Sequence, residues 1–91
     1  MSVIETTAKS LEMNPDDLLR ESLKLFIDQK LSAIEAEIFS IAKKHGVKDV
    51  FELDERIGKG LVSEDEAYDD YFQLDYLEAE RQKLKHAVEN F

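Results

Sequence analysis

The sequence lacks cysteine entirely, and among its 91 residues it has only three glycines, one proline and two histidines. Without cysteine, the chain can form neither disulfides nor thiolate metal sites, which suits an intracellular location. Residues 1–5 lack the basic leader and the apolar core of a signal peptide. The longest apolar run, Leu25-Phe26-Ile27, is far too short to span a membrane. We therefore expect a cytoplasmic protein that makes no membrane contact.

Basic residues are also scarce, with 12 Lys and Arg against 21 Asp and Glu and a formal net charge of −9. The first 45 residues carry 6 basic and 8 acidic groups, whereas the remainder carries 6 basic and 13 acidic groups. The acidity therefore belongs to the C-terminal half. This charge disfavours binding of the whole chain to nucleic acid or to anionic lipid.

The usual groupings of catalytic residues are missing as well. His45 and His86 lie near the ends of two different predicted helices, and the sequence contains neither a glycine-rich phosphate loop nor a His-Glu-x-x-His motif. The acidic run at residues 64–70 is typical of a helix start rather than of a calcium loop, which needs a turn glycine. The sequence predicts no enzymatic activity, no cofactor and no metal site.

The longest stretch without glycine or proline follows Pro15, and it predicts a helix over residues 15–45. Asn14 can cap its first turn, and Pro15 suits the first helical position. Gly46 can adopt the left-handed conformation that closes a helix, and Val47 can make the apolar contact that often follows. A helix of this length spans roughly 46 Å. A compact chain of this size has a radius of gyration of only about 12 Å, so the helix should extend beyond its own domain.

An apolar seam with alternating steps of three and four residues runs along this helix, as in a coiled coil. Because a seam that extends beyond its domain needs a partner, we expect a homodimer or a larger complex. The predicted dimer interface consists of Leu23, Ile27, Leu31, Ile34, Ile38 and Ile41.

Three further helices are predicted, at residues 3–13, 50–57 and 64–90. A strand at residues 3–7 is the alternative for the first, because that stretch is rich in β-branched residues. Asp49 with Glu52 and Ser63 with Glu66 resemble capping boxes, and Gly58 is the predicted stop of the helix at 50–57. The sequence thus predicts one all-α domain over residues 1–91, a dimerising helical hairpin or bundle with a possible hinge at 58–63.

Aromatic and acidic residues alternate near the start of the last predicted helix, where four of the eight aromatic residues fall within residues 68–76. Tyrosines often anchor protein interfaces, and surrounding acids steer basic partners toward them. The alternative is that some of these rings only pack on the long helix. The predicted partner-binding residues are Tyr68, Asp69, Asp70, Tyr71, Phe72, Asp75, Tyr76 and Glu78.

Two parts of the chain resemble known antitoxins. Residues 8–27 are similar to the helix–turn–helix half of ribbon-helix-helix antitoxins, with Asp17-Leu18-Leu19-Arg20-Glu21-Ser22-Leu23 at the matching position. The remainder resembles small archaeal and cyanobacterial antitoxins that are encoded beside a toxin, through Glu52-Leu53 to Ile57 with Gly60 and through Asp70-Tyr71 to Leu77-Glu78. The resemblance implies binding and neutralising of an RNA-targeting or nucleotidyl-transferring toxin through the C-terminal part.

The interpretation that follows is a non-enzymatic antitoxin-like homodimer that neutralises a basic toxin. A structural scaffold that only oligomerises is the alternative. A DNA-binding autorepressor is a weaker alternative, because ribbon-helix-helix proteins read DNA with a paired N-terminal strand that is usually basic. Residues 1–7 contain Glu5 and no lysine or arginine.

Overall fold

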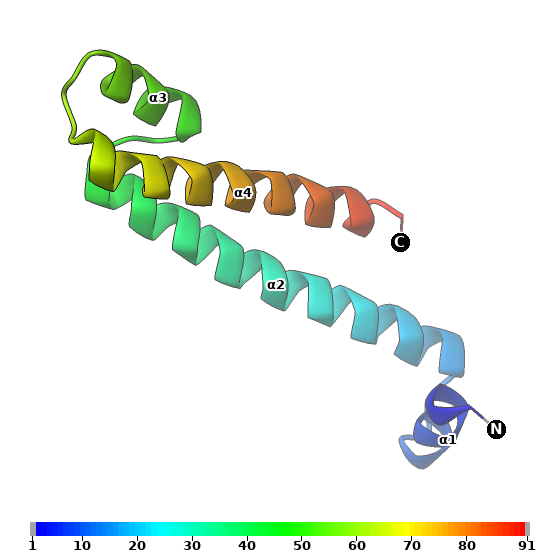
Figure 1. The fold of residues 1–91 in the computed structure, drawn as a ribbon. Helices are drawn as coiled ribbons and strands as arrows, with labels where there is room; N and C mark the ends of the chain where they lie inside the picture. Colours follow the sequence, from blue (N-terminus) through cyan, green and yellow to red (C-terminus); the bar gives the residue numbers. More distant parts are fainter. Residues whose placement is uncertain (1, 91) are drawn as a thin grey trace.

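The computed structural model of the chain describes residues 2–90, apart from the side chain of Glu64. Four helices follow one another and are drawn in Figure 1: α1 (Val3–Ser10), α2 (Pro15–His45), α3 (Val50–Gly58) and α4 (Glu64–Val88). The described residues contain no strand, which confirms the all-α prediction and makes residues 3–7 helical. None of the helices in this part of the chain is long and apolar enough to cross a membrane.

The helices α2 and α4 form an antiparallel hairpin, which is closed at the α3 end and splays open toward the C-terminus (Figure 1). The helix α1 folds against the far end of α2, beyond the reach of α4 (Figure 1). The radius of gyration is 19.0 Å and the principal extents are 60 × 19 × 18 Å. A compact chain of this length would have a radius of about 12 Å, so the predicted overhang of the long helix is confirmed.

The ends of α2 form as the sequence predicts. The Asn14 side chain accepts hydrogen bonds from the Asp16 N–H at 2.8 Å and the Asp17 N–H at 3.4 Å. Gly46 takes the left-handed conformation with a φ of 64°, and the Val47 N–H donates to the Ala42 carbonyl at 2.9 Å. Val47 and Ala42 both lie in the core, and this apolar contact completes the motif that closes the helix. The predicted bounds of 15–45 are therefore confirmed.

Other predicted helix ends were wrong by up to three residues. The first helix ends at Ser10 instead of residue 13, because Glu12 takes a φ of 58° and the Met13 N–H bonds back to the Ala8 carbonyl at 2.8 Å. Sequence reasoning missed this end because a left-handed residue is seldom glutamate. Gly58 is the last residue of α3 and does not stop it; Gly60, with a φ of 69°, is the left-handed residue after that helix.

The last helix begins where the sequence predicts but lacks the predicted cap. Ser63 is the N-cap residue, yet its side chain makes no capping hydrogen bond, whereas Asp49 accepts from the Glu52 N–H at 2.9 Å in α3. The helix ends at Val88, two residues before the predicted limit of 90, in a turn that Glu89 and Asn90 close with backbone bonds. The hinge suggested at residues 58–63 stays a prediction.

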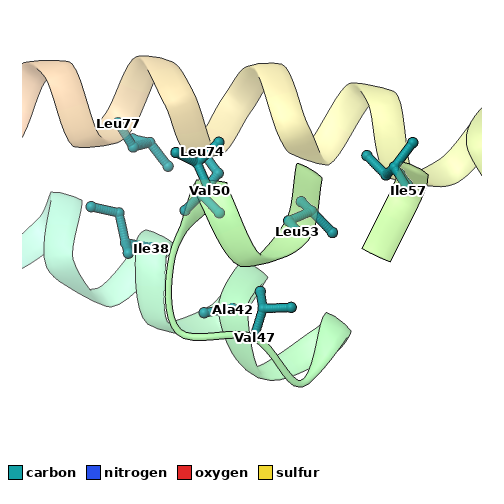
Figure 2. Close-up of a cluster of buried hydrophobic side chains, with 9 residues drawn as sticks. Ile38, Ala42, Val47, Val50, Leu53, Ile57, Leu74 and Leu77 are labelled. Carbon is teal, nitrogen blue, oxygen red and sulfur yellow. The ribbon is translucent and has the colours of Figure 1, made fainter. Parts of the chain in front are cut away.

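The core lies at the closed end of the hairpin, where α3 covers the junction of α2 and α4. Leu53 and Leu74 are its largest fully buried side chains, each with 0% exposure. Figure 2 shows these two side chains in the layer between α3 and α4, with Ile38 and Ala42 reaching the same cluster from α2. The cluster consists of Ile38, Ala42, Val47, Val50, Leu53, Ile57, Ala67, Leu74 and Leu77. Folding therefore fixes one end of α4, and the rest of the hairpin is held less tightly.

Candidate functional site

Three aromatic rings are exposed along α4. Tyr68, Phe72 and Tyr76 are 44%, 64% and 60% exposed, and their four-residue spacing places them in one row on the helix. The rings of Tyr68 and Phe72 stack with centroids 6.3 Å apart. Their row faces away from the buried Leu74 and Leu77, because at 100° per residue the two sets lie on opposite sides of the helix. The three rings therefore remain 44–64% exposed, although Phe72 also contacts the half-buried Tyr71 edge-on, with ring centroids 5.4 Å apart.

Carboxylates flank this row. Asp65, Asp69 and Asp75 are exposed on the same side of α4 as the three rings, within an arc of about 120°. Residues 64–80 contain eight acidic residues and no basic one. We name the three rings and these three aspartates the acidic–aromatic face. It contains five of the eight residues that the sequence predicts for partner binding.

Asp70 lies elsewhere, in a network that attaches α4 to the end of α2. Its Oδ2 accepts from the Lys44 Nζ at 2.8 Å and lies 2.7 Å from the His45 Nε2. Arg56 of α3 donates to the His45 carbonyl at 3.3 Å, so three helices meet at this point. The hydrogen bond from Lys44, followed by the contact with His45, holds the pKa of the Asp70 carboxyl below its usual range. These contacts give Asp70 a structural role within the chain.

We predict that Asp70→Asn lowers the free energy of unfolding by about 1 kcal/mol at neutral pH, because asparagine keeps the shape but loses the charge. A depressed folded-state pKa gives stability that is present above the unfolded-state pKa and is lost as the pH falls. The difference between wild type and variant should therefore shrink between about pH 5 and pH 2 in urea unfolding curves. The exposed neighbour provides the control, Asp69→Asn, which should have little effect. A difference that persists at the acid end would contradict the charge-based role.

Two more predicted partner-binding residues face the chain itself. Tyr71 is half-buried and packs against the core. Glu78 lies beside the start of α3, where burial raises the pKa of its carboxyl although the Val50 N–H and Arg81 act in the opposite sense. Arg81 Nη2 lies 4.0 Å from Glu78 Oε1. These residues shape the junction of α3 with α4 more than they shape the outer surface.

The predicted dimer seam is divided between two environments. Ile38 is buried in the core at 6% exposure, and Ile41 packs against that core. Leu31 is half-buried, whereas Leu23 remains 41% exposed. Toward its C-terminal end, the seam is therefore covered by the chain's own α3 and α4. Toward its N-terminal end, it lies where the two long helices diverge.

An open groove of about 690 Å³ occupies that divergence. Leu23, Ile27 and Ile34 of the predicted interface line it, and Phe26 and Tyr76 stand on its two sides. Its lining consists of Leu23, Phe26, Ile27, Lys30, Ala33, Ile34 and Glu37 from α2 and Gln73, Tyr76, Leu77, Glu80, Lys83, Leu84 and Ala87 from α4. Sequence reasoning found both apolar stripes but did not join them, because it had no measure of how far the hairpin opens.

The described side chains form neither a cluster that could bind a metal ion nor a pair of histidines. No three of the Asp, Glu and His residues that the structure describes gather so that they could hold a metal ion. The side chain of His45 is only 7% exposed and is engaged by Asp70, whereas His86 is 82% exposed near Glu89. The two histidines therefore share no site.

Comparison with known proteins identifies a family for the chain. The model of the Uncharacterized protein MJ0235 family matches residues 1–91. No curated protein and no solved structure matches the chain.

Proposed function

The chain belongs to the MJ0235 family along its whole length, and from the exposed face of its last helix we propose an antitoxin-like function. The proposed protein is non-enzymatic, dimerises through its long helix and neutralises a basic toxin by binding it through α4. The observation that carries this proposal is the row of Tyr68, Phe72 and Tyr76, three rings that the described chain leaves 44–64% exposed.

Exposed rings in a row are costly unless something covers them. Burying apolar surface is worth about 25 cal/mol per Å², and each tyrosine or phenylalanine offers about 150–250 Å². A chain of this size has too little core to leave three large rings unused without a compensating role. Interfaces concentrate their binding energy in aromatic anchors of this kind.

The charge around the row indicates which partners it suits. With eight acidic residues and no basic one over residues 64–80, this part of the chain repels acidic surfaces and attracts basic ones. A toxin that acts on RNA or on nucleotides must itself hold phosphates with a basic surface. An acidic helix that occupies such a surface would compete with the substrate, which is a direct way to neutralise the toxin.

The experiment that tests this proposal uses the protein encoded by the adjacent gene. That protein is expressed alone and together with this chain, and growth and co-purification are measured. We expect growth arrest by the neighbour alone, relief of the arrest by co-expression and a complex that survives purification. A neighbour that is harmless alone and does not co-purify would refute the proposal.

The open groove supports a second candidate function, a scaffold that only oligomerises. In that case the aromatic row would be covered by a second copy of the chain and no other protein would be needed. Solvent accessibility of Tyr68 in the assembled protein separates the two functions. It is measured by quenching of tyrosine fluorescence in a Tyr71→Phe, Tyr76→Phe variant, which keeps both rings in place and leaves Tyr68 as the remaining tyrosine. Accessible Tyr68 supports the antitoxin-like function, and protected Tyr68 supports the scaffold.

A further inference from the structure

We propose that a second copy of this chain packs into the groove between α2 and α4, giving a two-fold dimer whose four long helices form a bundle. This inference rests on the proposed function, which includes dimerisation, and it places the dimer contact in the groove between α2 and α4. It differs from the seam that the sequence predicts, because Ile38 and Ile41 are already used inside the chain.

The groove presents apolar side chains that the single chain only partly covers. Phe26 is 56% exposed and Leu23 is 41% exposed on the α2 side, and Tyr76 is 60% exposed on the α4 side. Ile27 also lines the groove but is already buried, at 7% exposure. Packed four-helix bundles bury such positions against facing helices, and two open hairpins supply the four helices that a bundle requires.

The charges in the groove favour a second copy over a basic partner. The lining contains two lysines, Lys30 and Lys83, and two glutamates, Glu37 and Glu80, so its net charge is zero. The whole chain carries −9, and two such chains repel each other over most of their surface. A neutral groove with both signs is where they can approach. A basic partner would instead be drawn to the part of the acidic–aromatic face outside the groove, around Tyr68 and Phe72, because the dimer covers Tyr76.

A two-fold axis through the groove also gives a consistent register. An axis perpendicular to the long helices reverses the direction of the second hairpin. In that arrangement α2 of one copy runs parallel to α4 of the other, because α2 and α4 are antiparallel within a chain (Figure 1). If Lys30 faces the Glu80 of the other copy, the same offset brings Phe26 to Tyr76 and Ile34 to Leu84. One register thus pairs opposite charges, two rings and two aliphatic side chains, and the symmetry provides each pair twice.

The first test is the mass of the chain alone, measured by sedimentation at tens of micromolar. We expect twice the 10.5 kDa of one chain. Phe26→Glu should weaken the dimer at least about thirtyfold, because it buries a charge where a ring packed. The control is its neighbour Leu25, which is 60% exposed and lies outside the groove, so Leu25→Glu should leave the mass unchanged. A monomeric wild type, or a dimer that Leu25→Glu breaks and Phe26→Glu spares, would overturn the proposal.

The second test examines the register by exchanging charges. In a dimer of the Lys30→Glu variant, a glutamate faces Glu80 in both symmetry-related pairs. In a dimer of the Glu80→Lys variant, a lysine faces Lys30 in both pairs. Each variant alone should therefore dimerise more weakly than wild type. When the two variants are mixed, a dimer with one chain of each kind has opposite charges in both pairs, so this mixed dimer should form. If residues 30 and 80 instead paired within one chain, mixing would not restore dimerisation. A mixture that stays as weakly associated as its components would overturn the register. Both tests use the chain without a toxin. Their failure would refute the dimer in the groove and would not refute toxin binding, which the co-expression experiment tests.

Discussion

The double variant Tyr68→Ala, Phe72→Ala is expected to bind the basic partner at least about a hundredfold more weakly than wild type. Both rings belong to the acidic–aromatic face, and neither lines the groove. The loss should therefore appear in the complex with the partner and not in the mass of the chain alone. Titration calorimetry with the purified partner measures it directly.

The matched control removes two rings that are exposed elsewhere. Phe39 of α2 and Phe51 of α3 are 67% and 79% exposed, and Phe39→Ala, Phe51→Ala should bind the partner as wild type does. Circular dichroism should show the same helix content in both double variants, since all four rings lie outside the core. Equal losses in the two variants would mean that affinity depends on exposed apolar area in general and not on this face of α4.

Leu74→Ala should lower the free energy of unfolding by about 3 kcal/mol, because it removes buried atoms and leaves a cavity that its neighbours cannot fill. Leu74 has 0% exposure and lies where α3 and α4 meet (Figure 2). Small domains are stable by only about 5–15 kcal/mol, so this variant loses a large share of its stability. Urea unfolding followed by circular dichroism measures the change.

The same substitution at an exposed helical leucine is the control. Leu25 is 60% exposed on α2, and Leu25→Ala should change the free energy of unfolding by less than about 0.5 kcal/mol. If the two variants were equally stable, the core at the closed end of the hairpin would not be what holds α4 against α2.

The sequence was sufficient for the elements whose signals are local. The bounds of α2 follow from Asn14, Pro15 and Gly46, each of which acts within a few residues of its own position. The elongated shape followed from helix length alone, since a helix of 31 residues cannot fit inside a compact chain of this size. The early end of α1 at Ser10 escaped this reasoning because Glu12 adopts a left-handed backbone that glutamate rarely takes.

The parts of the site that depend on distant contacts could not be read in advance. Asp69 and Asp70 are adjacent and chemically identical, yet only Asp70 meets Lys44 and His45, which precede it by 26 and 25 residues. Likewise, Ile27 and Ile38 both lie on the apolar seam that the spacing of three and four residues predicts. Ile38 joins the core and Ile27 lines the groove because α3 and α4 fold back onto the C-terminal part of α2. The sequence pattern does not show where on α2 this happens.

Locating the partner on the chain tests the proposed toxin binding through α4 most directly. Amide hydrogen exchange is measured for the chain alone and in complex with the protein of the adjacent gene. We expect added protection to concentrate over residues 65–80 of α4 and α1 to exchange as before. Added protection over α1 and the first half of α2, with residues 65–80 unchanged, would contradict it.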